Sequence, residues 1–112
     1  MKKTEIARKI EAWMKRNKLH TDSRIYFGGK AWNYDSSGTK SIIEDVKATE
    51  YFQYGNDDTI SLSFEGGLYR VMNYHWERPH LAELHTELFE LLQSYGYYAE
   101  LGNAWNLALY EV

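Results

Sequence analysis

The sequence predicts an α+β fold in which one twisted antiparallel sheet carries two helices on one face, in the order α-β-β-β-β-α-β-β. Two stretches have apolar residues at three-to-four spacing, and the segments between and after them are rich in strand formers. The 112 residues suit a single domain that covers residues 1–112. Aromatic residues make up 16% of the chain, a composition that folds rather than remaining disordered.

The first helix is expected to begin at Thr4, whose side chain can cap it, and to end near His20. Its apolar side recurs every three or four residues, at Ile6, Ala7, Ile10, Trp13 and Met14. Its other side is basic, which is either an ordinary solvated surface or a surface that binds anions.

Residues 24–34 are rich in strand formers but are interrupted by Gly28-Gly29, which indicates a bulge or a close backbone approach inside a strand or hairpin. Residues 35–39 read as a turn, and residues 41–46 as the next strand. Residues 47–54 fit either a helical turn or an edge segment, and they are left as irregular structure.

Residues 59–65 alternate polar and apolar side chains, which predicts a strand with Ile60, Leu62 and Phe64 facing the core and Thr59, Ser61 and Ser63 facing outward. Gly66-Gly67 then suits a two-residue hairpin turn. Residues 68–74 are accordingly expected to return as the antiparallel partner strand.

The second helix is expected to start at Pro79 and to stop at Gly96. It carries a clear apolar stripe of Leu81, Leu84, His85, Leu88, Leu91, Leu92 and Tyr95. Residues 97–101 and 104–111 then form a closing hairpin around Gly102-Asn103.

A five-residue pattern occurs twice, as residues 29–33 and as residues 102–106, each time with Gly first, Ala-Trp-Asn last. Each copy follows a helical stretch and a short aromatic run, which favours an internal duplication related by a pseudo-two-fold axis; chance recurrence in an aromatic-rich chain is the alternative. On either reading, Trp32 and Trp105 are expected to hold the fold together. Whether the repeat gives internal symmetry or a homodimer contact stays open.

Composition excludes several classes of function. The chain has no Cys, so it has no disulfide, thiol nucleophile or thiolate metal site, and the cytoplasm is the expected location. No apolar run approaches the roughly 20 residues that span a bilayer, and the basic start is not followed by a signal-peptide core, so neither a membrane nor export is expected.

No cofactor or metal is expected either. The four histidines lack the i, i+4 spacing of a helical zinc motif, and His80 and His85 point to different sides of their helix. No glycine-rich phosphate loop, nucleophile elbow or paired acid and base is present, which predicts a protein that is not an enzyme.

The charges are unevenly distributed along the chain. Residues 1–19 carry seven Lys or Arg and two Glu, whereas the remainder carries six basic and fourteen acidic residues. The basic helix can bind an acidic partner, the acidic remainder can bind a basic one, or the two can neutralise each other within the fold.

Exposed aromatics and carboxylates are the expected binding surface. Alternation predicts that some of Tyr26, Trp32, Tyr34, Tyr69, Tyr74 and Tyr98 lie on the side of the sheet away from the helices, where they favour contacts to proteins or unpaired bases. Trp32, Tyr34 and Tyr69 are the candidate anchors. The complementary charges are expected from Asp57, Asp58, Glu83, Glu87 and Glu90, the last three on the water-facing side of the second helix.

Residues 54–73, YGNDDTISLSFEGGLYRVMN, resemble short orphan proteins carried by conjugative elements and phages of Gram-positive gut bacteria. The resemblance covers about a sixth of the chain and brings no catalytic residues with it. It implies an accessory gene of a mobile element, a class that often encodes compact inhibitors of host defence complexes.

The expected function is therefore a non-enzymatic interaction protein that binds a host protein or ribonucleoprotein and blocks a site used by nucleic acid. The alternative is a small nucleic-acid-binding module that uses Lys9, Arg16 and Lys18 of the first helix together with the same aromatics.

Overall fold

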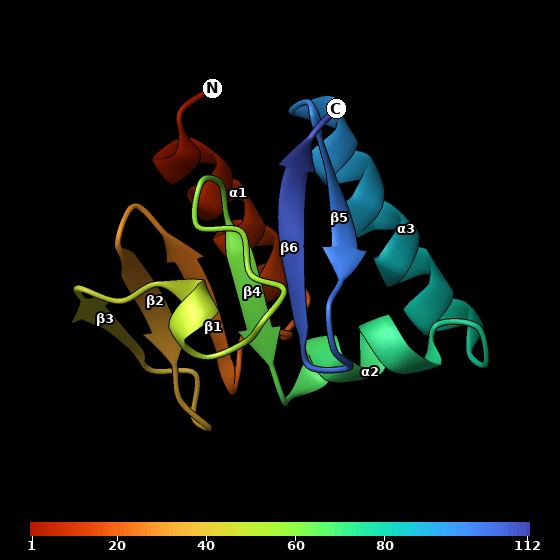
Figure 1. Cartoon of the computed structure of the whole chain (residues 1–112). Coiled ribbons are helices and arrows are strands. Elements are labelled where there is room, and N and C mark those ends of the chain that lie inside the picture. Colours follow the sequence, from red (N-terminus) through yellow and green to blue (C-terminus); the bar gives the residue numbers. More distant parts are fainter.

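The computed structural model describes residues 1–112 as a six-stranded antiparallel sheet with helices on one side (Figure 1). The strands are β1 (Ser23–Phe27), β2 (Lys30–Tyr34), β3 (Lys40–Glu44), β4 (Ser61–Phe64), β5 (Tyr97–Leu101) and β6 (Asn106–Glu111). They lie in the order β3-β2-β1-β4-β6-β5, and each neighbouring pair is antiparallel. The predicted α+β class is confirmed, although the order of the elements differs.

The helices are α1 (Lys3–Arg16), α2 (Gly67–Tyr74) and α3 (Pro79–Ser94), and a 3-10 turn, η1 (Ala48–Glu50), lies between β3 and β4. Figure 1 shows α1 and α3 behind the sheet, with α2 at its lower end. The large core lies between these helices and the sheet: Ile25, Leu62 and Leu107 stand side by side across β1, β4 and β6 and are fully buried.

The strand expected over residues 68–74 is wrong, because these residues form α2. Leu68, Val71 and Met72 are buried at helical spacing. An apolar run this short fits both the period of a helix and the period of a strand, so the sequence pattern alone does not distinguish them. Gly66 does not form a hairpin turn. A glycine is required there because its backbone lies close to the backbone of Thr21, and a Cβ would lie 2.4 Å from the Thr21 carbonyl oxygen.

Residues 24–34 form two strands, and Gly28 and Gly29 are the turn of the β1–β2 hairpin. Both have positive φ, 59° and 77°, as a tight hairpin turn with two left-handed central residues requires. Residues 24–34 are therefore a hairpin, and the alternative of one strand interrupted by a bulge is wrong.

The side of β4 that was expected to face outward is buried. Thr59 and Ser61 are almost inaccessible, while Ser63 is partly exposed. The Thr59 hydroxyl donates to the Leu109 carbonyl, and Ser61 Oγ accepts a hydrogen bond from the backbone of Asn56 at 2.8 Å. Polar alternation correctly predicted the strand, but both sides of this strand are covered.

The doubled motif does not occupy equivalent places. The first hairpin contacts β4 through its first strand, β1, and the last hairpin contacts β4 through its second strand, β6. Trp32 belongs to the large core, whereas Trp105 packs on the opposite side of the sheet. The expected pseudo-two-fold relation between the two motifs is therefore wrong.

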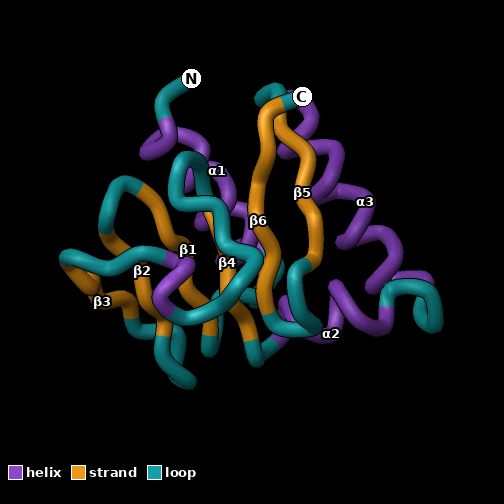
Figure 2. The backbone as a smooth tube through the Cα atoms, in the orientation of Figure 1, coloured by secondary structure: helices purple, strands orange, loops and turns teal.

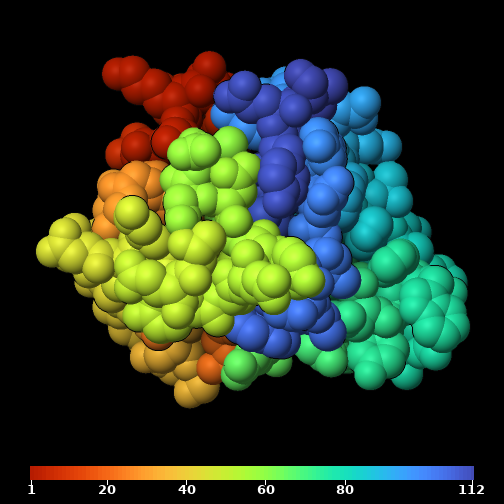
Figure 3. Space-filling view, viewed as in Figure 1, coloured from red at the N-terminus to blue at the C-terminus, as the bar shows by residue number.

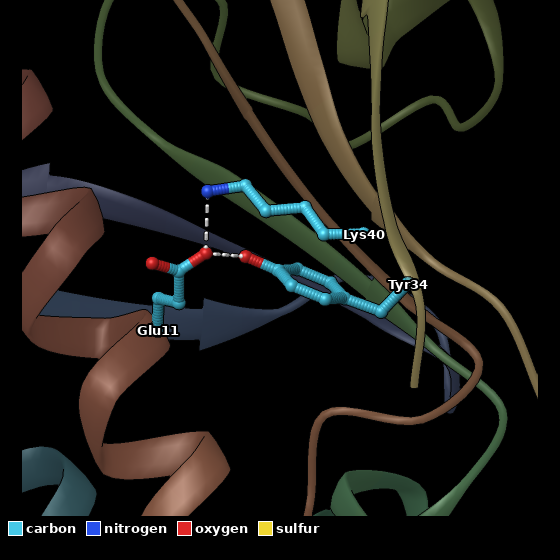
Figure 4. A network of polar contacts seen from close by, with 3 residues as sticks. All are labelled: Glu11, Tyr34 and Lys40. Atoms are coloured by element: carbon cyan, nitrogen blue, oxygen red, sulfur yellow. Dashed lines mark hydrogen bonds and ion pairs between the residues drawn. The ribbon is translucent and has the colours of Figure 1, made fainter. Parts of the chain in front are cut away.

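A polar network ties α1 to the outer strands (Figure 4). The Tyr34 hydroxyl donates to a carboxylate oxygen of Glu11, and Lys40 Nζ lies 2.7 Å from the same oxygen. Burial alone would raise the pKa of Glu11, but the hydrogen bonds from Lys40 and Tyr34 outweigh it and hold this pKa below its ordinary value. Burial and the neighbouring carboxylate raise the pKa of Tyr34, so its hydroxyl keeps its proton and remains a donor.

Replacing Tyr34 with Phe should lower the free energy of unfolding at neutral pH by about 1 kcal/mol, because it removes a hydrogen bond to a charged group that is partly solvated. The pKa of Glu11 is lower in the folded protein than in the unfolded one, so its stabilising effect exists above the unfolded pKa and is lost as pH falls through the folded pKa. Urea unfolding of both proteins should show a difference that shrinks in acid. A difference independent of pH would contradict this account.

Candidate functional site

The side of the sheet opposite the helices is covered by the connection between β3 and β4. Residues 45–58, here called the covering segment, are loop except for η1 (Figure 2). Figure 3 shows them spread across the face of the molecule, in yellow and yellow-green. The segment and the strands beneath it form a second, smaller core of Tyr26, Ala31, Val46, Ala48 and Phe52.

Hydrogen bonds fix the covering segment to the sheet and to itself. The Asn56 side-chain amide donates to the Leu109 carbonyl at 2.9 Å, and the Asn56 backbone donates to Ser61 Oγ. The Asp57 carboxylate accepts hydrogen bonds from the hydroxyl and the backbone of Thr49. A segment held in this way loses little conformational freedom when it binds a partner.

Phe52 is buried, and the two tyrosines near it in the chain are exposed. Tyr51 is 49% exposed and Tyr54 is 52% exposed. The covering segment also carries exposed carboxylates, those of Asp45, Glu50, Asp57 and Asp58, against one cation, Lys47. The segment therefore offers aromatic contact area beside negative charge.

A groove of about 490 Å³ opens where the ends of β1, β2 and β4 meet the covering segment. Three carboxylates line it, those of Asp22, Asp35 and Glu65, together with five aromatic residues, of which Tyr51 is exposed and Trp105 is half-buried. Its volume suits a side chain of a partner or a small molecule. The surface made by the covering segment and this groove is called the acidic face below.

Arg24 also lines the groove, and its guanidinium is held in place. Its Nε donates to Asn33 Oδ1 at 2.8 Å, and its Nη1 donates to the Tyr26 hydroxyl at 3.3 Å. The guanidinium carbon lies 5.5 Å from the centre of the Tyr51 ring, a cation–π contact that joins β1 to the covering segment. No carboxylate lies within 4 Å of it, so Arg24 forms no ion pair with any of the three carboxylates of the groove.

Asp35 is the groove carboxylate with its own hydrogen-bond donors. Its Oδ1 accepts bonds from the hydroxyl and backbone of Ser37 and from the backbone of Thr39. These bonds, the Ser37 hydroxyl first, hold the pKa of Asp35 below its ordinary value. The carboxylate is therefore charged well into mildly acidic conditions.

Trp32 and Tyr34 were expected as exposed anchors, and their placement is wrong. They are 6% and 1% exposed and belong to the large core. Alternation correctly places both on one side of β2, but that side is the one covered by α1. Tyr69 is half-buried on α2 and packs against the same core, so it is not on a sheet face.

The other aromatics expected on the bare side divide into two groups. Tyr26 is buried under the covering segment, and Tyr74 is exposed on α2. Tyr98 is exposed on β5 and stacks at 5.6 Å on Tyr110 of β6. The aromatic surface of this side therefore comes from the covering segment and from the Tyr98–Tyr110 pair on β5 and β6.

The five expected acidic residues lie on two different sides of the molecule. Glu83, Glu87 and Glu90 are exposed on α3, as their spacing predicted, and Glu87 accepts a weak hydrogen bond from Trp13 at 3.4 Å. Asp57 and Asp58 lie on the covering segment, with the sheet between them and α3. One flat partner surface cannot contact both sets.

The histidines lie at the α2–α3 corner and at the end of α1. His75 and His85 stack with 3.8 Å between ring centres, and burial together with the charge of His75 lowers the pKa of His85. No group of three or more His, Cys, Asp or Glu side chains is arranged to hold a metal ion. His80 lines a different groove, which contains no carboxylate.

The fold and the acidic face define a small α+β protein whose sheet is covered by helices on one side and by an acidic, tyrosine-bearing segment on the other. Comparison of the chain with protein-family models, with curated proteins and with solved structures finds no match. None of the three helices has the length and apolar character needed to cross a bilayer.

Tyr51, Tyr54 and Arg24 were not predicted as site residues. The sequence contains one signal for Tyr51 and Tyr54. They lie near Phe52 in a stretch that also contains acidic and turn-forming residues, and this composition is typical of a loop that buries one aromatic ring and exposes others. Arg24 sits on a strand among apolar residues, and only the packing of Tyr51 against it shows its place.

Proposed function

We propose that this chain is a non-enzymatic interaction protein that uses its acidic face to bind a basic surface of another protein or ribonucleoprotein. The binding blocks that surface sterically, so that nucleic acid cannot occupy it. The observation that carries the proposal is the covering segment, which presents exposed tyrosines and carboxylates from a backbone that is already fixed.

The chemistry of the acidic face suits a cationic partner. Tyrosines give large contact area at low entropic cost and are frequent among the residues that dominate binding energy at protein interfaces. Carboxylates beside them attract a basic surface over a distance and fix its orientation. A Lys or Arg side chain of the partner would enter the groove beside the carboxylates of Asp22, Asp35 and Glu65.

The resemblance of residues 54–73 to accessory proteins of mobile elements supports a more specific version of the proposal. The covering segment ends within this run, and so does β4. The partner would then be a nucleic-acid-binding component of a host defence system, and this chain would act as its inhibitor in the cytoplasm.

Charge reversal on the acidic face should weaken partner capture. The variant Asp58→Lys/Glu65→Lys changes two exposed carboxylates whose side chains make no hydrogen bond within the chain. In a pull-down from host lysate, the wild-type chain should retain a nucleic-acid-binding protein that salt or excess DNA releases. The variant should weaken this capture about tenfold or more, as expected when interfacial charges of the wrong sign are brought together.

The matched control is Glu83→Lys/Glu90→Lys, which makes the same change of net charge on α3, on the other side of the sheet. It should capture the partner as well as the wild type does. Equal losses in both variants would show that only net charge matters, and undiminished capture by the first variant would remove the acidic face from the interaction.

A further inference from the structure

A second groove, of about 520 Å³, lies where the end of α1 and the beginnings of α2 and α3 meet. Its charged lining residues are all basic: Lys18, Arg70 and Arg78, with His80 beside them and no Asp or Glu. None of these cations has a carboxylate within 4 Å, since the single ion pair of that length joins Lys40 to Glu11. In a chain with more acidic than basic residues, this leaves a local cluster of uncompensated positive charge.

The backbone at Lys18 adds a second observation. Lys18 follows the last turn of α1 with φ 57°, in the left-handed region. Its N–H bonds to the Lys15 carbonyl and the N–H of Leu19 bonds to the Met14 carbonyl at 2.7 Å, which is the helix-ending motif in which glycine normally occupies the position of Lys18. A lysine there costs stability compared with glycine, so the ending of the helix gives no reason for a lysine at this position.

The remainder of the lining is apolar. Leu19, Leu81 and Leu84 are buried and contribute to the wall beneath the cations. A groove with cations at one part and leucines at another suits a ligand that has both an anionic and an apolar portion. The arginines favour a phosphate, because their planar donors bond two of its oxygens at once.

We propose that this groove binds the phosphate group of a nucleotide, with Lys18, Arg70 and Arg78 as its ligands. The volume accommodates a mononucleotide. The same chemistry is offered by a free nucleotide and by the phosphorylated end of a nucleic acid strand. The site is separate from the acidic face. Of the three cations considered for nucleic acid binding, Lys9, Arg16 and Lys18, it includes only Lys18.

Titration of the full chain with ADP, followed by amide NMR shifts and by calorimetry, tests the site. We expect saturable binding that shifts the amides of Lys18, Arg70 and His80, and no such shifts with adenosine. The variant Arg70→Gln/Arg78→Gln should bind ADP about tenfold or more weakly, since each arginine supplies charged hydrogen bonds. The control Arg8→Gln/Lys9→Gln removes two exposed cations from the other half of α1 and should bind as the wild type does.

Lys18→Gly separates binding from folding. It should unfold at the same temperature or a higher one, because glycine suits the left-handed position, and yet bind ADP more weakly. A short DNA strand with and without a 5′ phosphate distinguishes the two sources of ligand: tighter binding of the phosphorylated strand than of ADP indicates a strand end, and the reverse order indicates a free nucleotide. The proposal is overturned if ADP shifts no amide of the groove, if adenosine binds equally well, or if the control variant loses as much affinity as the groove variants.

Discussion

Replacing Trp32 with Ala should lower the free energy of unfolding by about 3–5 kcal/mol, the cost of a large-to-small change in a packed core. The Trp32 ring contacts Phe27 edge to face, with 4.8 Å between ring centres. Lys40 Nζ lies over the Trp32 ring, 3.8 Å from the ring centre. The ring is almost fully enclosed by β2 and its neighbours, so the cavity cannot be filled by a small rearrangement. Urea unfolding followed by far-UV circular dichroism measures the change.

Trp76→Ala is the matched control for this prediction. Trp76 follows α2 in the loop before α3 and is 73% exposed, with no aromatic or hydrogen-bonding partner. Its removal should change the free energy of unfolding by no more than about 0.5 kcal/mol, as expected of a surface position. If both variants unfolded at the wild-type urea concentration, Trp32 would have no role in the core.

The difference between these two tryptophans shows what the sequence could predict and what it could not. Period-two alternation in β2 correctly puts Trp32 and Tyr34 on the same side of the strand. Which side of the sheet the helices cover is decided by the packing of α1 onto β1 and β2, and no local pattern carries that information. The sequence therefore predicted the pairing of the rings but not their burial.

The α2 segment is ambiguous for a different reason. The spacing of Leu68, Val71 and Met72 is consistent with a helix. The same short apolar stretch, preceded by two glycines, is also consistent with the second strand of a hairpin. The contact that decides between them is the approach of Gly66 to the backbone of Thr21, 45 residues earlier in the chain. By contrast, the long amphipathic stripes of α1 and α3 fit only a helix, and both helices were predicted correctly. The expected Thr4 cap is wrong, because Lys2 is the N-cap residue and makes no side-chain cap, and α1 ends at Arg16 rather than near His20.

The candidate site was the least predictable part because it is made by a loop. Nothing in the periodicity of residues 45–58 indicates that Phe52 inserts under the segment and closes the second side of the sheet. With Phe52 buried, Tyr51 and Tyr54 are exposed and Arg24 lies against the Tyr51 ring, so the burial of one side chain arranges the aromatic part of the acidic face.

Replacing Phe52 with Ala should consequently detach the covering segment while the helix-covered core remains folded. Phe52 is 4% exposed and packs edge to face on both Tyr26 and Trp105, at 5.6 Å between ring centres in each case. The loss of about 3 kcal/mol expected for such a ring falls mainly on a core of only five buried residues. Local opening of the segment should then cost far less free energy than global unfolding.

Amide hydrogen exchange measures this separation directly. Protection of the Asn56 amide and of the Val46 amide, which bonds to the Gly29 carbonyl, should fall by about a factor of 100, the equivalent of roughly 3 kcal/mol, whereas amides of α3 stay within the range of the wild type. Leu88→Ala is the complementary control, since it weakens the large core and should lower protection throughout the sheet. Because the segment carries Tyr51, Tyr54 and Asp58, Phe52→Ala should also lose the partner captured by the wild type. Uniform loss of protection in the Phe52 variant would mean that the covering segment unfolds only together with the rest of the protein.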